Sequence, residues 1–171
     1  MRIIKLGIIS LIVFSLLITG ISLFFPSHVR ISKATDIQTN RDSLLRQVAD
    51  ISNWKNWYPG ADTMQLLMEG GTIKGLQVDS SQGLIRLLTV NDSAITAISS
   101  GPAVRNAESG WNFFDGSRPN TVTIQWYMDF HLSWYPWEKF SSLLLEKRYG
   151  PMMEKGLDQL KKLLEKNQEI Q

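Results

Sequence analysis

The sequence predicts an α+β domain, an antiparallel β-sheet closed by a long C-terminal helix, which one apolar helix precedes. Three patterns carry this prediction. Residues 6–25 contain no ionisable side chain, residues 121–132 alternate between apolar and polar side chains, and apolar residues recur every three or four positions over 153–164. The first pattern is typical of a membrane span, the second of a one-sided strand and the third of an amphipathic helix.

Residues 6–25 (LGIISLIVFSLLITGISLFF) predict an uncleaved transmembrane anchor. At 1.5 Å per residue, about 20 apolar residues cross the ~30 Å hydrocarbon core of a bilayer. A cleaved signal peptide is the alternative, but its apolar core is shorter and ends at an A-x-A-like site, to which Gly20-Ile21-Ser22 is a poor match.

The charges around this segment predict its orientation. Arg2 and Lys5 precede it and favour a cytoplasmic N-terminus, while Arg30 and Lys33 beyond it oppose this weakly. We therefore expect a cytoplasmic tail over residues 1–5 and a single-pass protein. Its folded domain is expected on the outer, periplasmic or extracytoplasmic, side.

Residues 26–171 have the size of one ordinary domain. They contain all 16 Asp and Glu, and 16 of the 18 Lys and Arg, because only Arg2 and Lys5 lie outside them. This neutral domain without a basic stripe gives no reason to expect a nucleic-acid partner. The absence of cysteine excludes disulfides, thiolate metal sites and a cysteine nucleophile.

The first half of the domain predicts a strand, two short helical segments and then hairpins. Loose alternation over 29–37 indicates a strand, and Asn40 is a candidate N-cap for a helix that ends near Ala49. Trp54 and Trp57 share one side of the next helical turn, which Pro59-Gly60 ends. Short β-rich runs follow from 63 to 100, with turns at 70–71, 79–81 and 91–92.

Two longer strands are predicted at 107–114 and 121–132. In the second, the even-numbered positions are all apolar: Val122, Ile124, Trp126, Met128, Phe130 and Leu132. The odd-numbered positions are mostly polar, so one face of the sheet is expected to be buried and the other wet.

The C-terminal part is predicted to be helical from Pro136 onward. The segment Tyr149-Gly150-Pro151 is expected to break or kink this helix, because proline lacks the backbone donor. Beyond it, Met153, Leu157, Leu160 and Leu164 form an apolar stripe that includes Gly156. Such a helix is expected to cover the apolar face of the sheet.

Three stretches resemble one known superfamily. They are residues 54–59 (WKNWYP), residues 111–113 (WNF) with 121–126 (TVTIQW), and residues 149–151 (YGP) through 156–161 (GLDQLK). With the order of elements, they resemble the SRPBCC superfamily of START lipid-transfer domains, polyketide cyclases and pollen-allergen proteins, over roughly 28–166. The resemblance implies a helix-grip fold, a curved sheet of about seven strands around a long C-terminal helix, with a hydrophobic cavity between them. None of the three stretches is a catalytic signature.

The candidate ligand-binding residues are the large apolar side chains expected to face this cavity, with the glycine that leaves a gap on the helix. They are Trp54, Trp57, Trp111, Phe113, Trp126, Met128, Phe130, Met153, Gly156 and Leu160. Large rings can line a site for an apolar ligand, although each of them can equally fill a core.

The candidate catalytic and metal-binding residues do not form a pattern that predicts catalysis. Asp129 and His131 lie two apart on the polar face of their strand, so we interpret them as a solvent-face pair and expect no catalytic residue. His28 is the only other histidine and shares no ligand spacing with His131, so no metal site and no cofactor are expected. Trp134, Tyr135 and Trp137 around Pro136 are an alternative membrane-interface cluster.

The sequence thus predicts a membrane-anchored, non-catalytic binding domain for a hydrophobic small molecule or lipid. Two alternatives remain open: a polyketide cyclase/dehydrase-like enzyme, and an interaction module whose own side chains fill the cavity.

Overall fold

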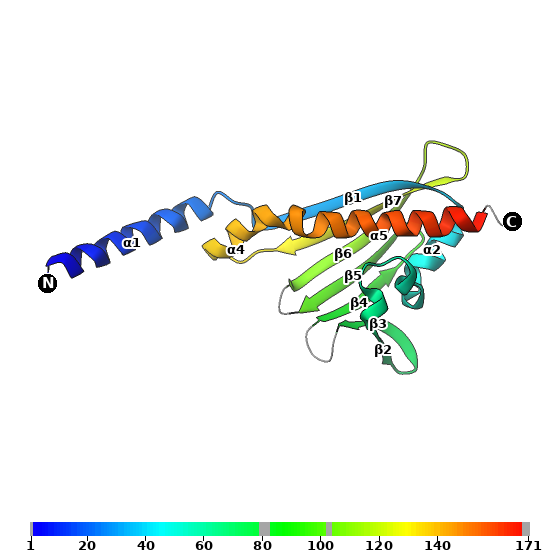
Figure 1. Cartoon of the computed structure of the whole chain (residues 1–171), viewed down its shortest axis with the longest axis horizontal. Helices are drawn as coiled ribbons and strands as arrows, with labels where there is room; N and C mark the ends of the chain where they lie inside the picture. Colours follow the sequence, from blue (N-terminus) through cyan, green and yellow to red (C-terminus); the bar gives the residue numbers. More distant parts are fainter. Residues whose placement is uncertain (1, 79–82, 102–103, 169–171) are drawn as a thin grey trace.

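The computed structural model describes residues 2–78, 83–101 and 104–168. Helix α1 (Arg2–Ser22) projects away from the rest of the chain, which forms one sheet with helices around it (Figure 1). The α+β class predicted from the sequence is confirmed.

The sheet has seven strands in the order β1-β7-β6-β5-β4-β3-β2, and all neighbours are antiparallel. The strands are β1 (His28–Gln38), β2 (Gln65–Glu69), β3 (Thr72–Val78), β4 (Gly83–Val90), β5 (Ala94–Gly101), β6 (Val104–Asp115) and β7 (Thr121–His131). Strands β2 to β7 follow one another as hairpins, and β1 pairs with β7 as the outermost strand.

Helices lie at both ends of this sheet. Between β1 and β2 the chain forms α2 (Arg41–Ala49), η1 (Ile51–Asn56) and η2 (Ala61–Thr63). After β7 it forms α4 (Pro136–Ser141), η3 (Ser142–Leu144) and α5 (Leu145–Gln168). Figure 1 shows α5 lying lengthwise over the sheet, close to β1. This helix covers the apolar face of the sheet, as the sequence predicts.

The predicted caps and turns are present where the structure describes them. The side-chain oxygen of Asn40 accepts a hydrogen bond from the Ser43 amide at 2.7 Å and begins α2. Gly70 and Gly71 turn between β2 and β3 with φ of 60° and 80°, which favour glycine. The predicted turn at 79–81 lies outside the described residues.

The alternation along β7 is confirmed on its inner face. Val122, Ile124, Trp126, Met128 and Phe130 are all buried and belong to the core.

Ion pairs connect α5 to the sheet at Lys33 on β1. The Lys33 ammonium lies 2.7 Å from the Glu146 carboxylate and 2.8 Å from the Glu154 carboxylate, both on α5. These two carboxylates raise the pKa of Lys33.

Two predicted boundaries differ from the structure. The break at Pro151 is wrong, because α5 runs through it from Leu145 to Gln168. Pro151 and Lys147, the residue whose carbonyl proline leaves without a donor, are both on the exposed side of the helix. The apolar helix covers Arg2–Ser22 instead of 6–25, and the next three residues form a turn before Pro26.

Candidate ligand-binding interior

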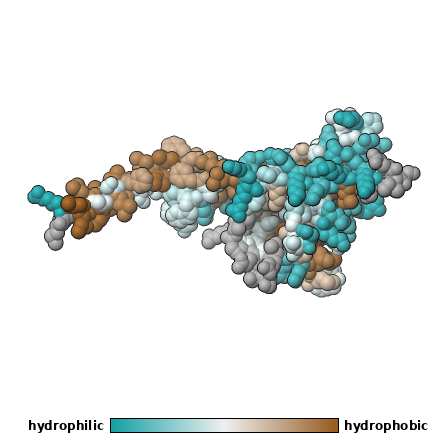
Figure 2. Space-filling model, viewed as in Figure 1, coloured by the Kyte–Doolittle hydropathy of each residue, from teal (hydrophilic) through white to brown (hydrophobic). Residues whose placement is uncertain are grey.

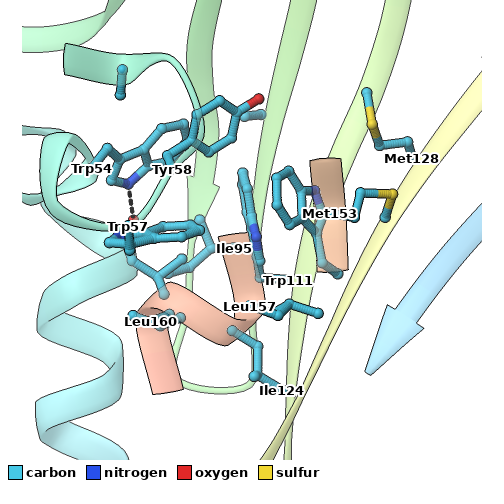
Figure 3. Close-up of a cluster of buried hydrophobic side chains, with 14 of the residues drawn as sticks. Trp54, Trp57, Tyr58, Ile95, Trp111, Ile124, Met128, Met153, Leu157 and Leu160 are labelled. Carbon is cyan, nitrogen blue, oxygen red and sulfur yellow. Dashed lines mark hydrogen bonds between the residues drawn. The ribbon is translucent and has the colours of Figure 1, made fainter. Parts of the chain in front are cut away.

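The side chains predicted to line a cavity come together between the sheet and α5. Nine are buried in a single core cluster, and the tenth, Gly156, is buried beside them: Trp54, Trp57, Trp111, Phe113, Trp126, Met128, Phe130, Met153, Leu160 and Gly156. Figure 3 labels six of these residues: Trp54, Trp57, Trp111, Met128, Met153 and Leu160. Tyr58, which was not predicted, belongs to the same cluster and stacks on Trp54 at 4.9 Å between ring centroids.

Two of the four buried tryptophans are held by helix α2. The indole N–H of Trp54 donates to the Val48 carbonyl at 2.8 Å, and that of Trp57 donates to the Gln47 carbonyl at 3.1 Å. These carbonyls lie in the last turn of α2, where a helix leaves its acceptors without intrahelical partners. Trp54 and Trp57 therefore have a structural role at the helix end.

The other two tryptophans have no such partner. Trp111 on β6 and Trp126 on β7 are directly opposed across the strand pair, with ring centroids 5.5 Å apart. Both indole nitrogens are buried, and neither has a hydrogen-bond partner among the described residues. The hydroxyl of Ser109, two positions before Trp111 on the same face, is buried and unpaired in the same way.

Small side chains surround Ser109 on the inner face. Ser109 is directly opposed to Ala97 on β5, and Ala107 is opposed to Ser99. On its other side Ser109 is opposed to Met128. We call Ala97, Ser99, Ala107 and Ser109 the small-residue patch. The patch was not predicted, although small residues at i and i+2 on two successive strands were a signal for it.

Gly156 does not leave an open gap in the helix. A Cβ atom on it would lie 2.8 Å from Cζ3 of Trp126 and 2.9 Å from Cδ of Pro59. The glycine lets α5 approach the Trp126 ring closely, so its role is to fit the helix against the aromatic cluster.

Tyrosines complete the interior. Tyr149 on α5 packs against Phe130 with ring centroids 5.0 Å apart. Burial raises the pKa of both Tyr58 and Tyr149, so these phenols are neutral at physiological pH. The interior therefore combines apolar surface with neutral hydrogen-bonding groups.

The titratable cluster lies on the outer face of the sheet. Asp129 accepts from Arg30 at 2.7 Å (Nε) and 2.5 Å (Nη2), and His28 Nε2 lies 3.1 Å from the same carboxylate. The hydrogen bond from Arg30 holds the pKa of Asp129 below its usual range. The predicted outer-face position is correct. The predicted solvent exposure is wrong, because the Asp129 side chain is only 7% exposed beneath its β1 neighbours.

The register also pairs the two histidines. His28 is opposed to His131 across β1 and β7, and their ring centroids are 4.8 Å apart. Spacing along the chain did not predict this contact. Within the described ranges, no three His, Cys, Asp or Glu side chains are grouped so as to hold a metal ion.

The Asp129 ion pair gives a pH-dependent prediction. Because the folded state lowers the pKa of Asp129, its stabilisation is complete above the unfolded value of about 4 and is lost as pH falls through the folded value. Asp129→Asn is expected to reduce the free energy of unfolding at pH 7 by about 1 kcal/mol, a modest value because Arg30 is half exposed. Urea titrations at pH 7 and pH 3 measure this, and an equal difference at both would contradict it.

Comparison with known proteins agrees with this architecture. The family model described as polyketide cyclase/dehydrase and lipid transport matches residues 28–165. Comparison with proteins of curated function gives no match.

Solved structures share the fold at low sequence identity. A START superfamily protein from Mycobacterium smegmatis superposes with a TM-score of 0.62 at 16% identity, and the match covers 80% of this chain and 97% of that one. The protein XoxI from Bacillus cereus gives 0.59 at 18% identity, with 80% and 95% covered. The fold, the sheet–helix interior and the match over residues 28–165 lead to one conclusion: this chain belongs to the polyketide cyclase/dehydrase and lipid transport family of the SRPBCC superfamily.

Proposed function

We propose that this protein binds one hydrophobic small molecule or lipid between its sheet and α5, without catalysis. The ligand carries hydrogen-bond acceptors, such as the carbonyl oxygens of an ester. It lies against the small-residue patch, with its acceptors directed at Ser109, Trp111 and Trp126.

The observation that carries this proposal is that three donors on the inner face of the sheet, Ser109, Trp111 and Trp126, are buried without partners in the described chain. Leaving such a group unsatisfied costs about 1–3 kcal/mol, so native interiors pair nearly all of them. In the same core, the indole N–H groups of Trp54 and Trp57 do have hydrogen-bond partners within the protein. An acceptor-bearing ligand would satisfy the remaining donors.

The Asp129 ion pair supports binding over catalysis. Asp129 is on the outer face, and Arg30 and His28 already occupy its oxygens. A general base must reach the proton that it abstracts, and this carboxylate is separated from the interior by the sheet.

Helix α1 would hold this binding domain at a membrane. It is 21 residues long, about 31 Å at 1.5 Å per residue. None of its most apolar stretch is buried against the rest of the protein. We assign residues 6–25 as the anchor, of which 6–22 lie in α1 and 23–25 form the turn that ends it, residues 1–5 as a cytoplasmic tail and residues 26–171 as a domain on the outer side. A signal sequence would have the same composition, and the uncleaved length of the membrane-bound protein distinguishes the two.

The ligand-free interaction module is the second candidate. Close contacts favour it, since Trp111 packs on both Trp54 at 5.1 Å and Trp126 at 5.5 Å between centroids. In that case the interior would bind nothing, and the three donors would be hydrated.

Probe binding by the detergent-purified full chain distinguishes these candidates. We expect native mass spectrometry of the parent chain to show a co-purified lipid. Ser109→Leu places a larger side chain in the small-residue patch and should weaken probe binding about tenfold, the effect of roughly 1.4 kcal/mol. Thr96→Leu, on the outer face beside Gly110, is the matched control and should bind normally. Unchanged binding by folded Ser109→Leu would contradict the assigned position.

The donors have a separate test. Trp111→Phe keeps an aromatic ring and removes one N–H, so affinity for a ketone-bearing fluorescent probe should fall about 3- to 10-fold, the effect of one hydrogen bond. Affinity for the hydrocarbon diphenylhexatriene should not change. Equal losses for both probes would show that the ring matters and the donor does not. Asp129→Asn should leave both affinities intact.

A further inference from the structure

We propose that the segment following β7 is a second membrane contact, which lies in the interface between headgroups and acyl chains beside the exit of α1. This proposal rests on the anchor proposed above. The contact surface, here called the α4 patch, consists of Trp134, Tyr135, Trp137, Leu143 and Leu144.

The α4 patch exposes large apolar side chains that a water-facing helix would normally avoid. The exposed fractions are 63% for Trp134, 66% for Trp137, 64% for Leu143 and 63% for Leu144. The other four tryptophans are at most 1% exposed, so the chain separates its indoles into a core set and a surface set. Trp137 and Leu144, seven positions apart, are on one side of the helical run.

The three aromatic rings of the patch pack on one another. Tyr135 lies 4.7 Å from Trp134 and 4.8 Å from Trp137 between ring centroids, and its ring is stacked on that of Trp137. The Ser133 amide donates to the Glu138 carboxylate at 2.7 Å and fixes the turn that precedes α4. Tryptophan and tyrosine are the side chains that concentrate at membrane interfaces, because their rings are amphipathic.

A buried lysine attaches this segment to the end of α1. The Lys139 ammonium donates to the Phe25 carbonyl at 3.3 Å and to the Ser27 hydroxyl at 2.5 Å. The Phe140 ring meets the Phe25 ring edge-on, with centroids 5.3 Å apart. The α4 patch is therefore held beside the residues that leave the apolar helix.

The exposed end of α1 makes the two apolar surfaces continuous. Leu23 and Phe24, directly before this attachment, are 71% and 91% exposed. Figure 1 shows α4 next to the point where α1 joins the domain, and Figure 2 shows the apolar rod of α1 reaching that point. A bilayer that surrounds α1 would have its surface at α4, so the occupant of the patch is the bilayer itself.

This contact would set the orientation of the binding domain. The start of β1, the end of β7 and the start of α5 would all face the membrane. The small-residue patch is in the same half of the sheet, because Ser109 pairs with Met128 near the end of β7. A lipid would then have a short path between the bilayer and the interior.

Quenching of tryptophan fluorescence by brominated lipid tests the contact. The full chain is reconstituted in phosphatidylcholine vesicles, with or without lipid brominated near the headgroup end of its acyl chains. The four core indoles are shielded, so quenching should come from Trp134 and Trp137. In Trp134→Phe/Trp137→Phe we expect quenching to fall by about threefold or more, since only these two indoles would reach the interface.

A control at the opposite end of the sheet completes the experiment. Phe114 is half exposed near the β6–β7 turn, so Phe114→Trp in the double variant should add fluorescence that brominated lipid does not quench. These variants change only exposed rings, so we expect them to fold normally. A urea unfolding curve equal to that of the parent chain checks this.

The outcomes separate the two proposals. Failure of the full chain to float with the vesicles would overturn the anchor, and the α4 patch contact with it. Flotation with equal quenching of the parent chain and the double variant would overturn the patch contact alone. Quenching of the Phe114→Trp indole as strong as that of the parent chain would place the domain on the membrane in another orientation and would overturn the α4 patch contact.

Discussion

Trp126→Ala is expected to lower the free energy of unfolding by about 3–5 kcal/mol, the usual cost of truncating a fully buried aromatic side chain. Trp126 is fully buried on β7, where its ring contacts Tyr58 and Trp111 at centroid distances of 5.2 and 5.5 Å. Removing it leaves a cavity that the close approach of α5 at Gly156 cannot easily collapse. Urea denaturation of the detergent-solubilised protein measures the loss.

Thr123→Ala on the same strand is the matched control. Thr123 is on the outer face, where its hydroxyl hydrogen-bonds an exposed carboxylate, Asp36, at 2.6 Å. Its removal should therefore change the free energy of unfolding by about 0.5 kcal/mol. A larger effect for Thr123→Ala than for Trp126→Ala would contradict the assignment of the two faces.

Gly156→Leu is expected to destabilise the domain by about 1–3 kcal/mol through overpacking. The new side chain would meet Trp126 and Pro59, whose atoms already lie within 3 Å of a Cβ at this position. Replacing glycine inside a helix favours the helix by about 1 kcal/mol, so a net loss requires the steric term to exceed this gain. The shift in the midpoint of urea unfolding shows directly whether Gly156→Leu stabilises or destabilises the domain.

Lys155→Leu adds the same side chain one position earlier, on the exposed face of α5. It should stay within about 0.5 kcal/mol of the parent chain. Stabilisation by Gly156→Leu would mean that the helix does not approach the Trp126 ring as closely as described. A ligand next to Trp126 would then have more room than the structure gives it.

The interior combines two kinds of surface with different consequences for a ligand. Around Trp54 and Trp57, rings pack on one another and the indole N–H groups are hydrogen-bonded to α2, so this region has no unpaired donor for a ligand. Around Ser109, small side chains meet Met128, whose unbranched thioether adapts to different shapes. Binding in the second region would leave the packing of Trp54 and Trp57 on α2 intact, and Ser109→Leu changes that region without truncating an aromatic ring, so it is a more selective test than any tryptophan truncation.

The sequence by itself determined the architecture, because local periodicity records burial. The alternation over 121–132 assigned the inner face of β7, the three- and four-residue spacing of Met153, Leu157 and Leu160 assigned the buried side of α5, and Asn40 marked the start of α2. Solvent imposes these patterns on each element separately, so they can be recognised without knowing its neighbours. The burial of the candidate ligand-binding residues on β7 and α5 follows from the same patterns.

Only the tertiary structure decided which polar groups have partners. The strands β1 and β7 are separated by 82 residues of the chain. Their register places Arg30 and His28 on Asp129 and shields a carboxylate that spacing assigned to solvent. The pairing of β5 with β6 gathers the small-residue patch, and packing of η1 on α2 satisfies Trp54 and Trp57 while Trp111 and Trp126 stay unpaired. Hydrogen bonds depend on distances of a few tenths of an ångström between distant segments, and no periodicity along one segment encodes them.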